Sequence, residues 1–427
     1  NINIYGQADK RADDLLVYYV RQGVVFDSPY DKDGKIRPFA TATDLYTRYP
    51  INPLLGFESD KLVNKDKTFG LDWSVSVDVK ITPWLSFVSQ NRISASTWRS
   101  HRHKAADIEY MHAGDELEEN QSFDFGVITT NMLKFDHNFS GHTLSGLLGY
   151  EAQMDQSDDM NAGGKGLPYG LYSLDVVSNS QYVSGAPSKT VMQSFIGQIN
   201  YNYAERYFLT ASFRADQSST FNKNNRTALF PSASVSWLIS NENFMKNAKA
   251  ITNLKIKASW GKTGMKDIGA SKYLEAFKYS SWYENNSAAV PSQMANPNLK
   301  WEQTSQTNIG LELGLYNRVN LDLNWYYNVT NDLLVYRDLA PSGGFASQWQ
   351  NMGSAVNTGF EAAINVTPVL SRDWRWDVDF SIAYNKNWLK GFDSPIFKSN
   401  YSGVSQIYTN DMPMYTWYLK EYAGVDP

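Results

Sequence analysis

The residue types best suited to metal chemistry gather in one polar stretch of the chain. They are His101, His103, His112, Asp107, Glu109 and Asp115. A zinc or calcium site is one interpretation and a solvated loop is the other. The histidine spacing matches no zinc-ligand pattern, and no predicted helix or strand holds the three together. We therefore expect a solvated loop and no metal site.

A second candidate for metal binding is Asp31-Lys-Asp-Gly34, which is similar to the start of a calcium loop. It lacks the third carboxylate position and the downstream Glu of such loops. The segment is predicted to be a turn, and no cofactor is expected.

Catalytic chemistry finds little support in the sequence. Glycoside hydrolysis needs two carboxylates about 5–10 Å apart on either side of the sugar, and adjacent acids such as Glu118-Glu119 and Asp158-Asp159 are not positioned for that work. The chain has no Cys, which excludes thiolate nucleophiles, thiolate metal sites and disulfides. No nucleophile elbow or phosphate loop is present. We expect a protein that is not an enzyme.

Aromatic residues in polar segments are the remaining functional signal. An aromatic face can stack on the C–H surface of a sugar, while neighbouring Asn and Asp side chains hydrogen-bond hydroxyl groups. The alternative is that these rings pack the loops against each other or against a partner protein. The candidate substrate-binding residues are Tyr279, Trp282, Tyr283, Trp349, Tyr408 and Trp417.

Composition limits the classes of protein to which these residues can belong. The 427 residues include 39 Lys and Arg and 44 Asp and Glu, for a net charge of −5. This balance gives no basic patch for nucleic acid. No uninterrupted apolar stretch approaches eighteen residues, which excludes spanning helices. A spanning β-barrel stays possible because its strands alternate polar and apolar side chains. Aromatic residues reach 14%, so many of them need a surface on which to lie.

The elements that must position these residues are β-strands. Residues 374–384 alternate strictly, with apolar side chains at even positions and polar or small ones at odd positions. The segments 307–315 and 319–329 alternate in the same way and are separated only by Tyr316-Asn-Arg318, so they predict a hairpin.

The same pattern recurs and predicts about thirteen strands, including a possible remnant at 2–5. Short links join strands into hairpins, and long polar connections join the hairpins, as short periplasmic turns and long extracellular loops do in outer-membrane barrels. The other strands are predicted at 69–81, 84–93, 123–135, 144–154, 191–201, 207–215, 230–239, 254–260 and 356–366.

Strand length and aromatic placement favour a transmembrane barrel over a soluble β-sandwich. Most of the predicted strands run to ten or more residues, whereas soluble strands cluster near five or six. A tilted strand needs about nine to eleven residues to cross the hydrocarbon. Trp and Tyr suit a headgroup boundary, and several lie beside the predicted short turns: Trp84, Tyr201, Tyr203, Tyr207, Tyr316, Trp374 and Trp376. A soluble all-β glycan-binding module is the alternative.

An odd number of strands does not close a bacterial single-chain barrel, and open edges in lipid leave backbone groups unpaired. We expect this chain to be one part of a larger barrel, with further strands before Asn1 and after Pro427.

Several motifs resemble those of the SusC/RagA-like TonB-dependent transporters. They are Tyr201-Asn-Tyr-Ala-Glu-Arg-Tyr-Phe-Leu-Thr-Ala-Ser-Phe-Arg-Ala-Asp216, Phe230-Pro-Ser-Ala-Ser-Val-Ser-Trp237, Leu254-Lys-Ile-Lys-Ala-Ser-Trp-Gly-Lys-Thr-Gly264, Asn296-Pro-Asn-Leu-Lys-Trp-Glu-Gln-Thr304 and Asn351-Met-Gly-Ser-Ala-Val-Asn-Thr-Gly-Phe-Glu361. They span roughly residues 190–390 in the order that the family has.

The resemblance implies that residues 1–427 are part of a 22-stranded antiparallel β-barrel domain in the bacterial outer membrane, with no plug domain in this chain. It implies a SusD-like lipoprotein as a lid over the extracellular mouth, and TonB, reached through an N-terminal region, as the energy source. The implied function is import of a nutrient oligomer, with oligosaccharide as the expected substrate and peptide as the alternative. Outer-membrane lipid would surround the barrel.

Overall fold

The structure is a computed structural model. It describes residues 2–10, 28–37, 52, 54, 62–104, 116–168, 170–283, 286–345, 347–400, 404–422 and 424. No helix among them is long and apolar enough to cross a membrane.

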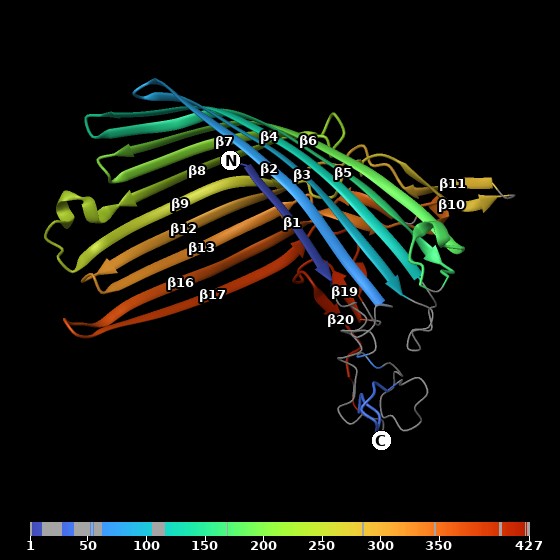
Figure 1. Cartoon of the computed structure of the whole chain (residues 1–427). Coiled ribbons are helices and arrows are strands. Elements are labelled where there is room, and N and C mark those ends of the chain that lie inside the picture. The colour runs from blue at the N-terminus through green and yellow to red at the C-terminus, as the bar shows by residue number, and fades with distance from the viewer. Residues whose placement is uncertain are drawn as a thin grey trace. The chain divides into compact units, whose positions relative to one another are not determined.

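Thirteen strands form one antiparallel sheet, and their order in the sheet follows their order in the chain (Figure 1). This confirms the predicted number. The strands are β1 (Ile2–Lys10), β2 (Leu62–Thr82), β3 (Leu85–Lys104), β4 (Glu116–Phe139), β5 (His142–Lys165), β6 (Asn179–Tyr203), β7 (Tyr207–Ser218), β8 (Thr227–Leu238), β9 (Ile251–Met265), β12 (Glu302–Leu315), β13 (Val319–Asn331), β16 (Ser354–Leu370) and β17 (Arg375–Lys390).

The residues divide into two compact units. Unit 1 comprises Asn1–Val75, Asn91–Ile128 and Met154–Lys189, and unit 2 comprises Ser76–Gln90, Thr129–Gln153 and Thr190–Pro427.

Most strands are longer than the sequence predicted, and β6 reaches 25 residues. The prediction ended a strand where the alternation of polar and apolar side chains ended. Strands continue past that point because backbone pairing needs no apolar face. The physical reason is that alternation reports contact with an apolar medium on one side, whereas the ladder of hydrogen bonds can extend into water.

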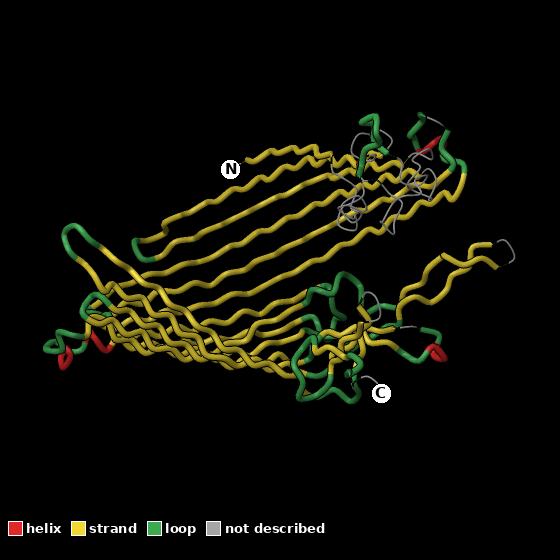
Figure 2. Tube along the Cα trace, turned by 90° about the horizontal axis from the view of Figure 1, so that it is seen from below, coloured by secondary structure: helices red, strands yellow, loops and turns green. Residues whose placement is uncertain are grey.

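Short turns join consecutive strands at one end of the sheet, and long connections join them at the other (Figure 2). We call these the short-turn end and the long-connection end. Three short turns place two consecutive residues at positive φ: Ser140-Gly141, Ala204-Glu205 and Tyr316-Asn317. Ser140-Gly141 is a two-residue hairpin loop, in which two such residues produce the required twist, and the other two loops each have a third residue, Arg206 or Arg318. The predicted alternation of short and long links is confirmed.

The strand register of unit 2 separates an apolar face from a polar face. One row of directly paired residues runs from β6 to β17 as Tyr201, Leu209, Val235, Ala258, Ile309, Trp325, Phe360 and Tyr384. The adjacent row is Asn202, Phe208, Ser236, Lys257, Gly310, Asn324, Glu361 and Ala383. Because successive side chains of a strand point to opposite faces, the two rows lie on opposite faces.

The apolar face is exposed rather than covered by a second layer of protein. Phe380 is 56% exposed, and Leu323 and Leu313 are half-buried and belong to neither buried cluster described below. An exposed apolar surface of this extent needs an apolar environment. The sandwich alternative required a facing layer over these residues, and it is wrong.

Buried apolar side chains gather instead at the long-connection end of unit 2. One cluster contains Phe221, Phe230, Leu299 and Trp301, and the other contains Leu333, Ala355, Leu389 and Phe392. The connections were predicted to be polar loops, but those between β9 and β12 and between β13 and β16 contain four further strands, and three more follow β17 in the described part of the chain. These are β10 (Ala276–Tyr283), β11 (Asn286–Gln293), β14 (Leu334–Asp338), β15 (Ser347–Asn351), β18 (Ile396–Asn400), β19 (Val404–Tyr408) and β20 (Thr416–Tyr418).

Candidate functional site

A network of paired charges lies on the polar face of unit 2. Lys257 Nζ on β9 is 2.9 Å from Glu312 Oε1 on β12 and 3.4 Å from Asp322 Oδ1 on β13. Glu312 and Asp322 are directly opposite each other in the register. Two facing carboxylates repel each other, so the ammonium between them stabilises the pairing.

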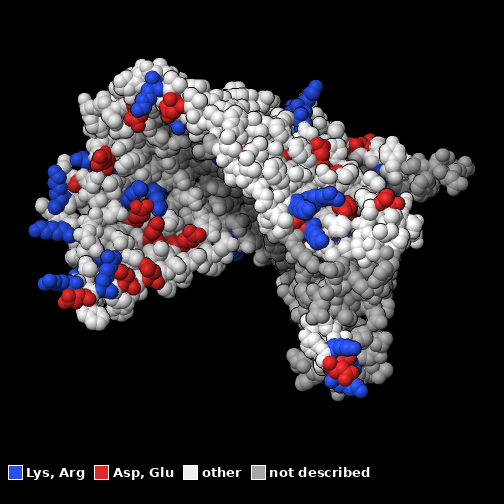
Figure 3. All heavy atoms as spheres, in the orientation of Figure 1, with Lys and Arg blue, Asp and Glu red and all other residues white. Residues whose placement is uncertain are grey.

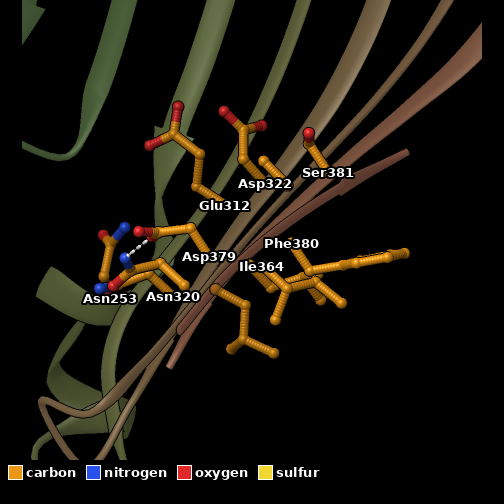
Figure 4. Close-up of a pocket in the computed structure, with 12 residues that line it drawn as sticks. Asn253, Glu312, Asn320, Asp322, Ile364, Asp379, Phe380 and Ser381 are labelled. Atoms are coloured by element: carbon orange, nitrogen blue, oxygen red, sulfur yellow. Dashed lines mark hydrogen bonds between the residues drawn. The ribbon is translucent and has the colours of Figure 1, made fainter. Parts of the chain in front are cut away.

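These acids border a hollow of about 410 Å³ between β9 and β17 (Figure 4). Polar side chains of Asn253, Asn320, Asp322 and Ser381 line it. In Figure 4 the side chains of Glu312, Asp322 and Ser381 point to one side of the sheet, whereas Ile364 and Phe380 point to the other. Adjacent residues of one strand thus belong to the polar face and the apolar face in turn.

A second hollow, of about 470 Å³, lies on the same face between β7 and β12. Hydroxyl groups dominate one part of its lining: Ser212, Ser232, Ser234, Ser259 and Thr263. Arg214 and Asp216 also line this hollow.

Arg214 is held by partners from three strands. Its Nε donates to Asp216 Oδ1 at 2.6 Å, and its Nη2 donates to Glu151 Oε1 at 2.7 Å and to Ser194 Oγ at 2.8 Å. Because both carboxylates are already paired with the guanidinium, the group is a fixed dipolar surface rather than a free cation. Such a surface can hydrogen-bond a polar solute, and its paired groups are not arranged as a nucleophile and base.

Further charged side chains lie on this polar face. Figure 3 shows Lys, Arg, Asp and Glu gathered over the hollowed surface of the later strands and along their short-turn ends. Sequence reasoning did not single out these residues as functional. The signal that could have found them was the pairing of the predicted 307–315 and 319–329 strands, which sets Glu312 opposite Asp322.

The six aromatic candidates take different positions in the long connections. Tyr279 on β10 is 75% exposed and Trp417 on β20 is 59% exposed. Trp349 on β15 is half-buried against the first cluster and packs on Tyr336 with ring centroids 5.3 Å apart. Trp282 and Tyr283 lie on β10, and their side chains lie outside the described residues.

Tyr408 on β19 packs against the second cluster and contacts Tyr415 edge to face, with centroids 5.9 Å apart. Burial raises the pKa of the Tyr408 phenol, and the neighbouring Tyr415 adds to the shift. Trp349 and Tyr408 therefore behave as packing residues, whereas Tyr279 and Trp417 are available to a solute. The described members of the set do not converge on one site.

The histidine prediction is wrong in its structural basis. His101 and His103 lie on β3, not in a loop. The Nε2 of His101 is 3.0 Å from the Nδ1 of His103, and the Nδ1 of His101 is 2.5 Å from Glu119 Oε1 on β4. Asp107, Glu109, His112 and Asp115 lie outside the described residues. Alternation of polar and apolar residues did not predict this stretch of β3, because the polar side chains of Arg99, His101 and His103 lie on the strand face that is apolar in the earlier part of β3.

The turn predicted at Asp31 is confirmed. Asp31 Oδ1 accepts hydrogen bonds from the backbone N–H groups of Asp33 and Lys35, each at 2.9 Å, and Gly34 has φ of +80°. The side chain that a calcium loop would use as a ligand closes the turn instead.

Aromatic residues gather at the short-turn end of unit 2, as predicted. His142, Tyr203, Tyr207 and Trp237 form a ladder with successive ring centroids 4.6, 6.4 and 6.1 Å apart. Trp84, Tyr316, Trp374 and Trp376 are exposed at the same end. Rings with an apolar body and a polar tip suit the boundary between hydrocarbon and headgroups.

Glu242, in the turn between β8 and β9, closes this ladder. Its Oε1 accepts hydrogen bonds from Tyr207 Oη at 2.6 Å and Trp237 Nε1 at 3.0 Å, and its Oε2 lies 3.3 Å from Arg206 Nη1. The Tyr207 hydrogen bond, followed by that from Trp237, lowers the pKa of the Glu242 carboxyl, and the Arg206 charge acts in the same direction.

Comparison with known proteins identifies a family. A family model described as TonB dependent receptor-like, beta-barrel, matches residues 4–422. TonB-dependent receptor P3 of Formosa agariphila is 36% identical over 270 residues, which cover 61% of this chain and 27% of that protein. TonB-dependent receptor SusC of Bacteroides thetaiotaomicron is 35% identical over 210 residues, which cover 47% of this chain and 21% of that protein.

A solved structure has the same fold. The RagAB peptide importer in the "open-open" state superposes with a TM-score of 0.84 at 23% identity, covering all of this chain and 48% of that one. The chain thus spans less than half the length of each relative named here.

Proposed function

Because this chain belongs to the TonB-dependent receptor-like β-barrel family, we propose that the protein imports a nutrient oligomer through the bacterial outer membrane. The thirteen strands are part of the outer-membrane barrel.

The observation that carries the proposal is the separation of the two faces of the unit 2 sheet. The row that contains Ile309, Trp325 and Phe360 suits lipid, and the adjacent row with Lys257, Asn324 and Glu361 suits water. A barrel with this arrangement has an apolar band outside and a polar interior. The polar interior is the route that a water-soluble oligomer would take.

We propose oligosaccharide as the substrate class. The hollow lined by Ser212, Ser232, Ser234 and Ser259 offers neutral hydroxyl groups that match those of a sugar. Exposed Tyr279 and Trp417 offer stacking surfaces in the long connections.

Peptide is the second candidate, because Arg214 with Glu151 and Lys257 with Glu312 offer charges of both signs for peptide termini and side chains. The RagAB structures carry the name of a peptide importer. At 23% identity that likeness concerns the fold, so it does not decide between the two substrates.

We propose two protein partners. A SusD-like surface lipoprotein would cover the long-connection end, and TonB would deliver energy through a part of the protein outside this chain. Half-buried aromatics such as Trp349 and Tyr408 hold the long connections in packed clusters, and packed connections can present a defined surface to a lid protein.

The experiment is a binding assay on the full-length protein with its lid protein, against panels of oligosaccharides and peptides. Tyr279→Ala and Trp417→Ala are each expected to weaken oligosaccharide binding several-fold by removing an exposed ring. Tyr316→Ala is the matched control, since Tyr316 is 68% exposed at the opposite end of the strands.

If the protein bound peptides and no oligosaccharide, peptide would replace oligosaccharide as the proposed substrate class. If deletion of the gene left growth on every panel compound unchanged, the import proposal itself would be overturned. Equal losses in the Tyr279→Ala and Tyr316→Ala proteins would remove the role given to the exposed aromatics.

A further inference from the structure

Two imidazoles stand side by side on β3 in unit 1. His101 and His103 are two residues apart on one strand, so their side chains leave the same face. The His101 Nε2 atom and the His103 Nδ1 atom are 3.0 Å apart. We propose that this pair chelates a divalent transition-metal ion of the Zn²⁺ or Cu²⁺ kind, independently of the imported solute.

The spacing of the two nitrogen atoms suits chelation. Metal–nitrogen bonds of about 2.0–2.1 Å at a tetrahedral centre place two ligand nitrogens about 3.3 Å apart. The observed 3.0 Å is within a few tenths of an ångström of that value. To become ligands of one ion at a tetrahedral centre, the two rings must each turn until the nitrogen lone pair points about 35° off the line that joins the two nitrogens.

Glu119 determines which nitrogen of His101 is available. A carboxylate only accepts hydrogen bonds, so the 2.5 Å contact places a proton on His101 Nδ1 and leaves the Nε2 lone pair facing His103. A carboxylate that orients a ligating histidine through its other nitrogen is typical of metal sites. Arg99 holds this carboxylate in turn, with Nε and Nη2 each 3.2 Å from Glu119 Oε2.

His103 is also held in place. It is 6% exposed, and its ring stacks on Tyr172 with centroids 3.7 Å apart and planes 6° from parallel. A metal ion needs the lone pair of each facing nitrogen, so the proton that lies between His101 Nε2 and His103 Nδ1 in the metal-free pair must leave that position when the ion binds.

The site supplies two protein ligands. Among the residues that the structure describes, no group of three or more His, Asp or Glu side chains is spaced to hold a metal ion. Glu119 acts through His101 and does not itself face the ion. Water would complete the coordination of the ion.

The test is calorimetric titration of the full-length protein with ZnCl₂, after purification through a tag without histidine. We expect one equivalent of Zn²⁺ to bind. His101→Gln and His103→Gln should each abolish this binding, and Glu119→Gln should weaken it about 10- to 100-fold through loss of orientation. His137→Gln is the matched control, because His137 is an exposed histidine at the short-turn end of β4, and it should bind as the unmodified protein does.

A second measurement needs no variant. The electron paramagnetic resonance spectrum of one bound equivalent of Cu²⁺ should show coupling to two imidazole nitrogens. No binding at millimolar Zn²⁺, or equal loss of binding in the His101→Gln and His137→Gln proteins, would overturn the proposal. A Cu²⁺ spectrum without nitrogen coupling would do the same.

Discussion

At the scale of single residues, Glu242 illustrates how one carboxylate can organise the short-turn end. It is buried and accepts hydrogen bonds from Tyr207 and Trp237 on two neighbouring strands. These bonds favour its charged form, so its pKa in the folded protein lies below the ordinary value near 4.5. The unfolded chain binds a proton more readily at this group than the folded chain does.

The consequence is a pH dependence of stability. A group whose folded pKa is lowered stabilises the fold fully above its ordinary pKa, and this contribution disappears as pH falls through the folded pKa. We expect the thermal midpoint in detergent to drop as pH falls below about 4.5. Glu242→Gln should start with a lower midpoint at neutral pH and show a flatter decline.

Glu205→Gln is the control for this measurement, since Glu205 is exposed on a neighbouring turn. Its midpoint should follow that of the unmodified protein at every pH. Parallel curves for the Glu242→Gln protein and the unmodified protein would show that Glu242 does not contribute in this way.

At the scale of elements, close approach of strands depends on Gly359. A Cβ atom at this position of β16 would lie against the backbone carbonyl oxygen of Tyr384 on β17 and the Tyr326 hydroxyl on β13. The carbonyl cannot move without disturbing the ladder between β16 and β17.

Gly359→Ala is therefore expected to destabilise the folded protein by about 1–3 kcal/mol, as overpacking does elsewhere. The measurement is the midpoint of urea unfolding. Unfolding is detected by the change in mobility of the unheated protein in a denaturing gel. Gly343→Ala is the control, because a Cβ at Gly343 meets open space. Unfolding at the same urea concentration for both variants would contradict the close-approach argument.

At the scale of the whole molecule, the decisive feature is which face of the sheet meets lipid. Leu323 and Asn324 are neighbours on β13 and point to opposite faces. Leu323 pairs with Leu311 and Ala362, and Asn324 pairs with Gly310 and Glu361. Substituting the same cation at the two positions tests the assignment of the faces.

Leu323→Arg should cost about 2–4 kcal/mol if the position lies near the bilayer midplane. Asn324→Arg places the same charge near Glu361 on the polar face and should change stability little. The readout is the amount of heat-modifiable folded protein in outer-membrane fractions. A larger loss for Asn324→Arg than for Leu323→Arg would reverse the two faces and overturn the barrel assignment.

Sequence reasoning reached the sheet because alternation is a local property. The positions of Leu323 and Asn324 on opposite faces could be read from their neighbours alone, and so could the Tyr316-Asn317 hairpin. It failed in the long connections. Segments such as Gln348–Asn351 look polar, yet Asn351 donates to the backbone carbonyls of Lys300 and Asp332, which are 51 and 19 residues away in the sequence.

What the sequence determined by itself was the number of strands in the main sheet, the alternation of short and long links, and the two chemically different faces. These follow from side-chain spacing along single strands and from turn residues. Only the tertiary structure decided which charges meet and which aromatics are exposed. The His101–His103–Glu119 contact needs two strands in one register, and the burial of Trp349 and Tyr408 needs connections far apart in sequence to pack together. Such contacts depend on how strands and connections align in space, which no local pattern encodes.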